Sequence, residues 1–284
     1  MAGILYLIAT PIGNLEDITL RALRVLREEV AVIACEDTRQ SRKLLEHYQI
    51  QKPLISYHEH NEANRTEELI ERMERGESVA LISDAGTPLV SDPGYRVVNA
   101  AIERGIAVVP LPGASAVLAG LAASGLPTDE FRFVGFLPAK SGARRKALEA
   151  LSDERATVIA YESPHRLLDT LVDMAEVFGS RRIVVARELT KLHEEFLRGP
   201  AGEVQAELVK RPSVKGEITI LIGRSEEKAP IGDPLEEIQR LQSEEGLDRM
   251  EAIKVVAKRL GLPKREVYRL SAEQGNNPPR KHRD

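Results

Sequence analysis

The first part of the chain alternates short apolar runs with segments of helical periodicity. Residues 4–9 form a continuous apolar run, which is typical of a strand buried on both faces of a sheet. Leu20, Leu23 and Leu26 then recur at helical spacing, and Asp17 or Thr19 can cap that helix. Further strands are predicted at 30–35, 54–57, 79–82 and 107–111, and helices at 42–48 and after a capping box at 64–67. This alternation predicts a mostly parallel sheet covered on both faces.

The second part repeats the pattern less regularly. Strands are predicted at 131–136, 158–161, 183–186, 195–197 and 218–222, and helices at 115–124, 144–151, 166–178 and 203–210. No full helix fits between Ala186 and Glu195, so we expect a mixed sheet here. A hinge near Gly113 would divide two lobes, at 1–112 and 113–224, and a cleft between lobes is the usual place for a ligand.

The last 60 or so residues differ in composition from the rest. Residues 225–234 resemble a linker, and 277–284 are expected to form a disordered tail. Between them, 235–276 predicts three short helices with helix-turn-helix-like geometry. The apolar face of the second helix would be met by Val267, Tyr268 and Leu270 of the third.

Composition excludes several classes of protein. The chain has 284 residues, a formal net charge of −4 and one cysteine. A single cysteine excludes a disulfide framework and any multi-cysteine metal site. No apolar run approaches the roughly 20 residues that span a bilayer, and the N-terminus lacks the basic lead of a signal peptide. We therefore expect a soluble, cytoplasmic protein with no membrane partner. The negative charge disfavours a nucleic-acid coat protein but allows a local basic face.

Four polar, Gly- and Pro-containing loops follow strands of the first lobe. They occupy 9–14, 36–39, 83–88 (with 91–94 just behind) and 110–116. Each loop alone is compatible with a simple turn, but four at one sheet edge favour a ligand site. Neither a G-x-x-x-x-G-K-[ST] run nor a G-x-G-x-x-G run is present, which argues against a P-loop nucleotidase and a dinucleotide-binding enzyme.

Two further features have a structural and a functional interpretation. The tetrad 58–61 (HEHN) offers two imidazoles and a carboxylate, but a continuing strand would point His58 and His60 to opposite faces. A metal site is therefore disfavoured, and Glu59 or Asn61 would contact substrate or cap the next helix. Cys35 ends an apolar strand, which favours a core residue over a nucleophile.

The second lobe offers candidate acid–base groups. At its strand-to-helix corner, Glu162 could act as a general base and Arg166 as a phosphate clamp. In the alternative interpretation, Ser163 caps the helix and the Glu162 carboxylate interacts favourably with the positive, N-terminal end of the helix dipole. Lys191 is attractive because a desolvated lysine loses its proton near neutral pH, although it could equally lie in a solvated turn.

A basic cluster follows the strand at 131–136. It includes Arg144 and Arg145, which could hold a phosphate backbone or form a solvated face.

Taken in order, eight motifs resemble one family. They are 9–15 (ATPIGNL), 36–39 (EDTR), 58–61 (HEHN), 83–88 (SDAGTP), 112–116 (PGASA), 135–138 (GFLP), 162–166 (ESPHR) and 187–191 (RELTK). Together they resemble the bacterial ribosomal RNA small subunit methyltransferase I family of the tetrapyrrole methylase superfamily, over most of residues 4–223. The resemblance implies two α/β lobes of tetrapyrrole methylase type with S-adenosylmethionine in the cleft between them, plus a small C-terminal helical domain. It also implies a homodimer that methylates a cytidine ribose 2′-hydroxyl in small-subunit ribosomal RNA. Of the two possible partners, the assembled subunit is favoured over the free RNA.

The resemblance also carries site residues onto this chain. Cofactor contacts are implied at Thr10, Pro11, Asp84, Gly86, Thr87, Ser115, Ala116, Tyr161 and Glu217. On the substrate side, we hypothesise that Glu162 or Lys191 assists deprotonation of the hydroxyl. RNA contacts are assigned to Arg39, Arg144, Arg145 and Arg166, and no metal ligand is assigned.

Three rival interpretations are kept. A methyltransferase of the same fold could act on a tetrapyrrole or another small molecule, although Ser83-Asp84-Ala85 stands where such members often have Gly-Asp-Pro. A ligand-sensing DNA-binding regulator would use the helical tail as its reader, but the tail lacks a strongly basic recognition helix. A pure scaffold gives no reason for four ligand-type loops at one sheet edge.

Overall fold

The computed structural model describes residues 2–225, 234–260 and 263–274. The chain separates into two compact units, Met1–Ser225 and Glu226–Asp284. Most of the predicted linker, at 226–233, and the predicted tail at 277–284 lie outside the described residues. In the described part of the chain, no helix has both the length and the apolar character needed to cross a membrane.

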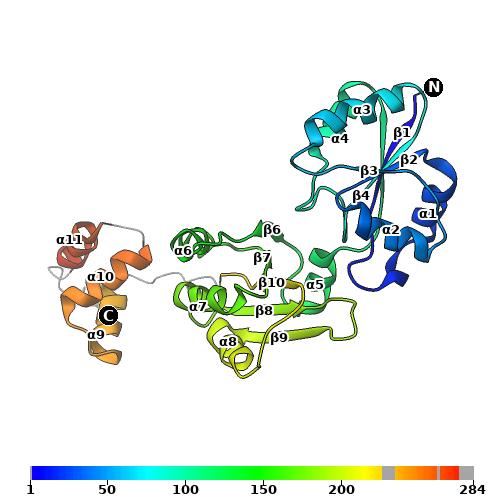
Figure 1. Cartoon of the computed structure of the whole chain (residues 1–284). Helices are drawn as coiled ribbons and strands as arrows, with labels where there is room; N and C mark the ends of the chain where they lie inside the picture. The colour runs from blue at the N-terminus through cyan, green and yellow to red at the C-terminus, as the bar shows by residue number, and fades with distance from the viewer. Residues whose placement is uncertain (1, 226–233, 261–262, 275–284) are drawn as a thin grey trace, which may run out of the picture. The chain divides into compact units, whose positions relative to one another are not determined.

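The first lobe is built on a parallel sheet, as predicted. Its strands are β1 (Ile4–Ile8), β2 (Val32–Cys35), β3 (Leu54–Ser56), β4 (Val79–Ile82) and β5 (Ala107–Leu111), in the order β3-β2-β4-β1-β5. All five end at the same edge, because Ile8 lies beside Ile82 and Leu111, and Cys35 lies beside Ile82 and Ser56. Helices α1 (Leu20–Arg24) and α2 (Thr38–His47) pack on one face, and α3 (Glu62–Glu74) and α4 (Tyr95–Glu103) on the other (Figure 1).

Three local features of this lobe differ from the sequence prediction. The capping box at 64–67 lies inside α3, where the buried Thr66 hydroxyl pairs with that of Tyr57 at 3.1 Å. Helix α1 is capped by Thr19, one of the two predicted caps, but it ends at Arg24 and continues as a π-helical turn, Val25–Glu29. Helix α4 was not predicted, and it begins after Gly94, whose φ of +140° is a conformation that favours glycine.

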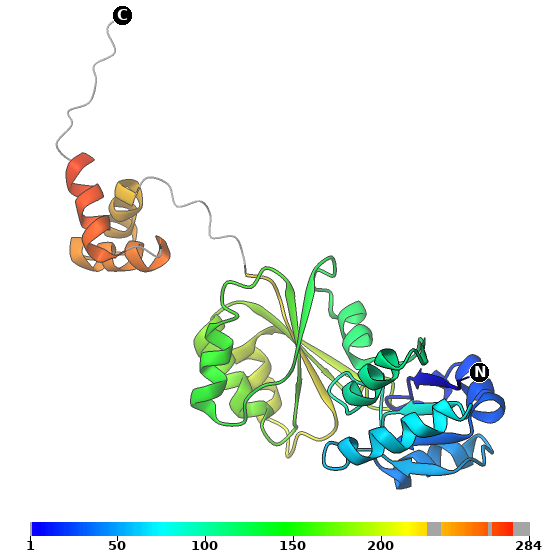
Figure 2. The same cartoon turned by 90° about the horizontal axis from the view of Figure 1, so that it is seen from above.

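The second lobe contains the predicted mixed sheet. Its strands are β6 (Phe131–Phe136), β7 (Thr157–Glu162), β8 (Arg182–Arg187), β9 (Glu195–Pro200) and β10 (Ile218–Ile222), in the order β6-β7-β10-β8-β9. Only β6 and β7 pair in parallel. Helices α6 (Ser141–Glu149), α7 (Leu167–Phe178) and α8 (Ala201–Val209) cover one face, and α5 (Ala116–Ser124) lies on the other (Figure 2).

The two lobes meet where β5 leads into α5. A Cβ on Gly113 would come 2.7 Å from the Cβ of Ala9, so the loops after β5 and β1 touch at a point where no side chain fits. Ile12, from the loop after β1, packs in one buried cluster with Leu121 of α5 and Leu221 of β10. The lobes therefore share an apolar core at this junction, beside the edge where the first-lobe strands end.

The C-terminal unit is helical, as predicted. Helices α9 (Pro234–Glu244), α10 (Arg249–Leu260) and α11 (Lys264–Gln274) pack around their own buried cluster, which includes Leu241, Val256 and Val267. The prediction that Tyr268 faces this cluster is wrong, because its side chain is 52% exposed.

Candidate functional site

A cavity of about 430 Å³ lies at the strand-end edge of the first sheet. Its first-lobe wall comes from Ile12 after β1 and residues within the segment 84–92 after β4, and the start of α5 adds to the second-lobe wall. Strands β7 and β10 of the second lobe complete it. Among the predicted cofactor residues, those that line the cavity are Asp84, Gly86, Thr87, Ser115, Ala116, Tyr161 and Glu217. The structure thus brings together predicted residues from both lobes, such as Asp84 and Glu217, that lie far apart in the sequence.

Thr10 and Pro11 are not part of this lining. Thr10 is 1% exposed, its hydroxyl donates to the Ser83 carbonyl at 3.0 Å, and its backbone N–H and C=O both pair with Gly86. Thr10 therefore joins the loops after β1 and β4, which opposes a cofactor contact through its hydroxyl. Pro11 is likewise buried, and the next residue, Ile12, lines the cavity instead.

The loops after β2 and β4 are tied together by acidic groups. The Asp37 N–H donates to an Asp84 carboxylate oxygen at 3.1 Å. Burial, together with the Asp37 charge, raises the pKa of Asp84 above its ordinary value. Asp37 also caps α2 and accepts from the Arg39 guanidinium at 2.8 Å, which lowers the pKa of Asp37 to about 2. Arg39 stays 87% exposed in its side chain, so it is open to a partner beside the cavity.

Asp92 is a cavity residue that the sequence analysis missed. Burial raises the pKa of Asp92 to about 7, with a further contribution from the charges of Glu36 and Asp84. In the sequence, residues 91–94 stand out only as a segment just behind the third loop. The available signal was a second carboxylate close in sequence to Asp84, but the partial burial of Asp92 at the cavity, near Glu36 and Asp84, cannot be seen in the sequence.

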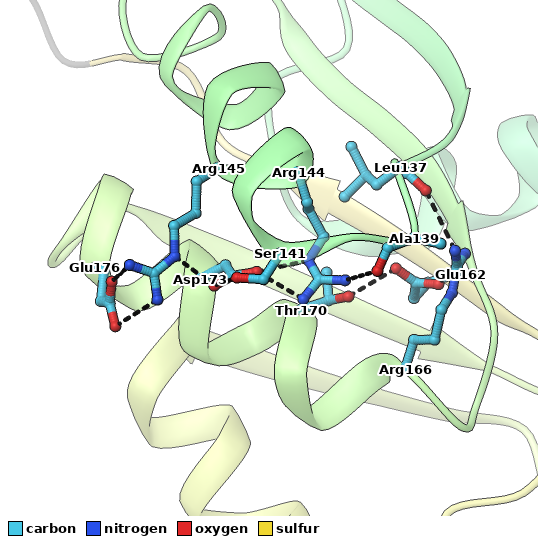
Figure 3. A network of polar contacts seen from close by, with 10 residues as sticks. All are labelled: Leu137, Ala139, Ser141, Arg144, Arg145, Glu162, Arg166, Thr170, Asp173 and Glu176. Atoms are coloured by element: carbon cyan, nitrogen blue, oxygen red, sulfur yellow. Dashed lines mark hydrogen bonds and ion pairs between the residues drawn. The ribbon is translucent and has the colours of Figure 1, made fainter.

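Glu162 lines the cavity but is fully engaged within the protein (Figure 3). Its side chain is inaccessible to solvent; one oxygen accepts from the Ser163 N–H at 2.7 Å and pairs with Arg166 at 2.5 Å. The other oxygen accepts from the Thr170 hydroxyl at 2.7 Å. These partners oppose the predicted role of Glu162 as a general base, and Ser163 does not cap α7 with its side chain. Arg166 is committed to Glu162 and the Leu137 carbonyl, which opposes its role as a phosphate clamp.

Lys191 is held between two carboxylates. Its ammonium lies 2.8 Å from Glu188 and 3.0 Å from Glu217. Burial alone would lower the pKa of Lys191, but the two carboxylates outweigh burial and raise it. The prediction that Lys191 loses its proton near neutral pH is therefore wrong. Its neighbour Thr190 accepts a hydrogen bond from the Asn14 N–H at 3.1 Å, which joins the two lobes.

The predicted RNA contacts on α6 form an internal ion-pair network (Figure 3). Arg144 is 3% exposed and lies 2.6 Å from the equally buried Asp173. This placement contradicts its predicted contact with RNA, because the guanidinium does not reach solvent. Arg145 is 42% exposed but is paired with Asp173 at 2.7 Å and with Glu176 at 2.5 Å. A phosphate would have to compete with both carboxylates.

The HEHN tetrad forms a braced turn. Asn61 accepts from the His58 N–H at 2.9 Å and donates to the Ser56 carbonyl at 3.0 Å, and its side chain makes no capping bond to α3. Across the described ranges, no group of three or more His, Cys, Asp or Glu side chains is arranged to hold a metal ion. Cys35 is buried in the core of the first lobe, as predicted.

Comparisons with known proteins agree with this architecture. The family model for tetrapyrrole (corrin/porphyrin) methylases matches residues 4–205. Among solved structures, diphthine synthase is similar with a TM-score of 0.58 at 14% identity, over 78% of this chain and 90% of that one. Uroporphyrin-III C-methyltransferase from Thermus thermophilus in complex with S-adenosyl homocysteine gives a TM-score of 0.54 at 21% identity, over 78% and 98%. At these identities the structural likeness shows the fold.

Sequence relatives are much closer. The ribosomal RNA small subunit methyltransferase I of Halalkalibacterium halodurans is 48% identical over 94% of both chains. The protein of the same name from Pseudomonas aeruginosa is 55% identical over 72% of both, and that from Escherichia coli O157:H7 is 45% identical over 96% of both. Such similarity over nearly the whole length shows that the chain belongs to the ribosomal RNA small subunit methyltransferase I family, within the tetrapyrrole methylases.

Proposed function

We propose that this chain transfers a methyl group from S-adenosylmethionine to the ribose 2′-hydroxyl of a cytidine in small-subunit ribosomal RNA. The observation that carries the proposal is the cavity between the lobes, where most of the cofactor residues implied by the family meet. The relatives named for methylation of small-subunit ribosomal RNA support the substrate. The structure of Thermus thermophilus uroporphyrin-III C-methyltransferase, a fold neighbour solved in complex with S-adenosyl homocysteine, supports the cofactor.

The chemistry of the lining fits such a cofactor. Ile12, Val90 and Leu189 supply apolar wall, which suits the adenine and ribose of a nucleoside. Asp84 and Glu217 place carboxylates at the cavity, which suit a sulfonium and an amino group. Hydroxyl groups on Thr87, Ser115 and Thr219 add short polar contacts.

When bound, the cofactor would supply an activated methyl group on a good leaving group. The task of the protein is then to hold the accepting hydroxyl in line and to keep water out. Lys191 keeps its positive charge and fixes the position of Glu217, which reaches the cavity from the start of β10. The hydrogen bond between Asp37 and Asp84 fixes the opposite wall.

For the RNA, we propose Arg39 as a phosphate contact. It is the most exposed of the predicted RNA contacts, and Asp37 orients it beside the cavity. A guanidinium can donate two parallel hydrogen bonds to a phosphate. By resemblance to the family, we also propose that the enzyme acts as a cytoplasmic homodimer on the assembled small subunit.

The test is transfer of labelled methyl from S-adenosylmethionine to small ribosomal subunits from cells that lack this protein. Separation of the product nucleosides then places the label. Label on a cytidine ribose is the expected result. Label on a base, or transfer only to a tetrapyrrole, would overturn the proposed substrate. Arg39→Ala, assayed in the same way, should raise KM for the subunits, while Arg42→Ala on the same helix serves as a matched control.

A further inference from the structure

The cavity contains four carboxylates, and their hydrogen bonding distinguishes them. They are Asp84, Asp92, Glu162 and Glu217. Glu162 is saturated by three donors, Glu217 is paired with Lys191, and Asp84 accepts from a backbone N–H. Within the described ranges, Asp92 is the cavity carboxylate that receives no hydrogen bond and forms no ion pair. Its lone pairs are therefore available to a ligand.

The backbone beside Asp92 is strained. Leu89 and Ser91 both adopt positive φ, at +71° and +68°, a conformation that costs a non-glycine residue about 1 kcal/mol or more. Ser91 also lies across from the second lobe, because a Cβ on Gly135 would be 3.7 Å from its hydroxyl. Such strain is typical of segments that hold a functional group in place.

We propose that Asp92 is the general base that accepts the proton of the methylated hydroxyl. The inference deepens the proposed function and rests on it. In the step, the hydroxyl oxygen gives its proton to an Asp92 oxygen and bonds to the methyl carbon, while the electron pair of the broken carbon–sulfur bond stays on sulfur. Asp92 leaves the step as a carboxylic acid and returns the proton to water.

The surroundings of Asp92 suit this role. The titratable groups that face it are Glu36 after β2, Asp84 after β4 and Tyr161 of β7. Burial and the two carboxylates raise the pKa of Asp92 to about 7, so it is a stronger base than an ordinary aspartate and is still substantially ionised at neutral pH. Neither Glu162 nor Lys191 offers this combination, since one is saturated and the other stays protonated.

The test compares Asp92→Asn with wild type on the same small subunits, with Asp169→Asn on the exposed side of α7 as a matched control. Loss of a general base typically lowers turnover 10²–10⁴-fold. We expect kcat of Asp92→Asn to fall about 100-fold or more, with S-adenosylmethionine affinity by calorimetry changed less than about threefold, and Asp169→Asn to behave as wild type. The rise of wild-type kcat with pH through about 7 should be absent in the residual activity of the variant.

Thermal unfolding supplies a readout that needs neither cofactor nor substrate. A raised carboxyl pKa means that ionisation of Asp92 destabilises the fold, so the penalty is fully present above about pH 7 and is absent below the unfolded value near 4. Asp92→Asn should therefore melt higher than wild type at pH 8, and the difference should vanish towards pH 4.

The possible results separate a failure of the proposed function from a failure of Asp92 as the base. No transfer by wild type overturns the proposed function and, with it, the role of Asp92. Transfer by wild type with less than a tenfold loss in Asp92→Asn overturns Asp92 alone. A variant with unchanged kcat but much weaker cofactor binding would also overturn the base, because it would make Asp92 a contact for the cofactor. Equal melting of the variant and wild type at pH 8 would contradict the electrostatic surroundings assigned here.

Discussion

Loss of the Asp173 carboxylate should lower the free energy of unfolding more than a substitution at any of the exposed residues around it. Its carboxylate accepts from Ser141 at 2.9 Å, Arg145 at 2.7 Å and Arg144 at 2.6 Å (Figure 3). Burial alone would raise the pKa of Asp173, but these donors outweigh it and the pKa lies below its usual value. The native state therefore depends on a charged Asp173 between α6 and α7.

The size of the expected loss in unfolding free energy follows from the burial of the ion pair. Asp173→Ala leaves the guanidinium of Arg144, only 3% exposed, without its counter-ion. Breaking one side of a buried ion pair costs about 3–5 kcal/mol. Glu176→Ala is the matched control, because Glu176 is 50% exposed and its pair with Arg145 is a surface pair of about 0–1 kcal/mol. For a unit of this size, Asp173→Ala should lower Tm by about 6–20 °C.

The assay is urea unfolding followed by circular dichroism, with calorimetry for Tm. The double variant Arg144→Met/Asp173→Leu should recover much of the lost stability, since buried ion pairs can be replaced by apolar residues at little cost. A loss for Asp173→Ala no larger than that for Glu176→Ala would refute the reasoning. So would a double variant as unstable as the single one, because the uncompensated charge would then not be the cause.

Three further outcomes are expected. Gly113→Ala should lower Tm and weaken S-adenosylmethionine binding in calorimetry, because its Cβ would come 2.7 Å from that of Ala9; unchanged Tm and affinity would contradict this contact. Glu195→Gln should lose about 2–3 kcal/mol in urea unfolding at pH 7; since Arg211 holds the pKa of Glu195 at about 2, the loss should shrink as pH falls through 4 and vanish near 2. Cys35 should react with a thiol reagent only on unfolding, because it is 0% exposed and burial raises the pKa of its thiol. Fast labelling of the native protein would contradict the buried position of Cys35.

Elements with strong local patterns were predictable from the sequence. Strands β6 and β10 have the predicted bounds because each is an apolar or aromatic run ended by Gly, Pro or polar residues. Helix α4 was missed because its buried positions are few, at Val97 and Ala101, and its start depends on the backbone of Gly94. Residues 64–67 do not form the predicted capping box, because Thr66 is buried and its hydroxyl pairs with that of Tyr57.

The location of the site was predictable, but the state of its charged groups was not. Loops that follow parallel strands meet at one edge by topology, so the first-lobe side of the site could be located from the predicted strands, whereas the individual cofactor residues are implied by the family resemblance. The roles of Glu162, Lys191 and Arg144 depend on partners such as Thr170, Glu217 and Asp173 that only the fold brings near. The raised pKa of Asp92 has the same origin.

The central claim is that the cavity between the lobes binds S-adenosylmethionine, and calorimetric titration tests it most directly. The variants are Ala116→Phe, which fills the cavity at the start of α5, and Ala122→Phe, an exposed position on the same helix. Wild type and Ala122→Phe should bind one cofactor per chain with the same affinity, and Ala116→Phe should lose at least about tenfold, or roughly 1.4 kcal/mol. Binding to Ala116→Phe as tight as to wild type, or no binding to wild type, would contradict the account.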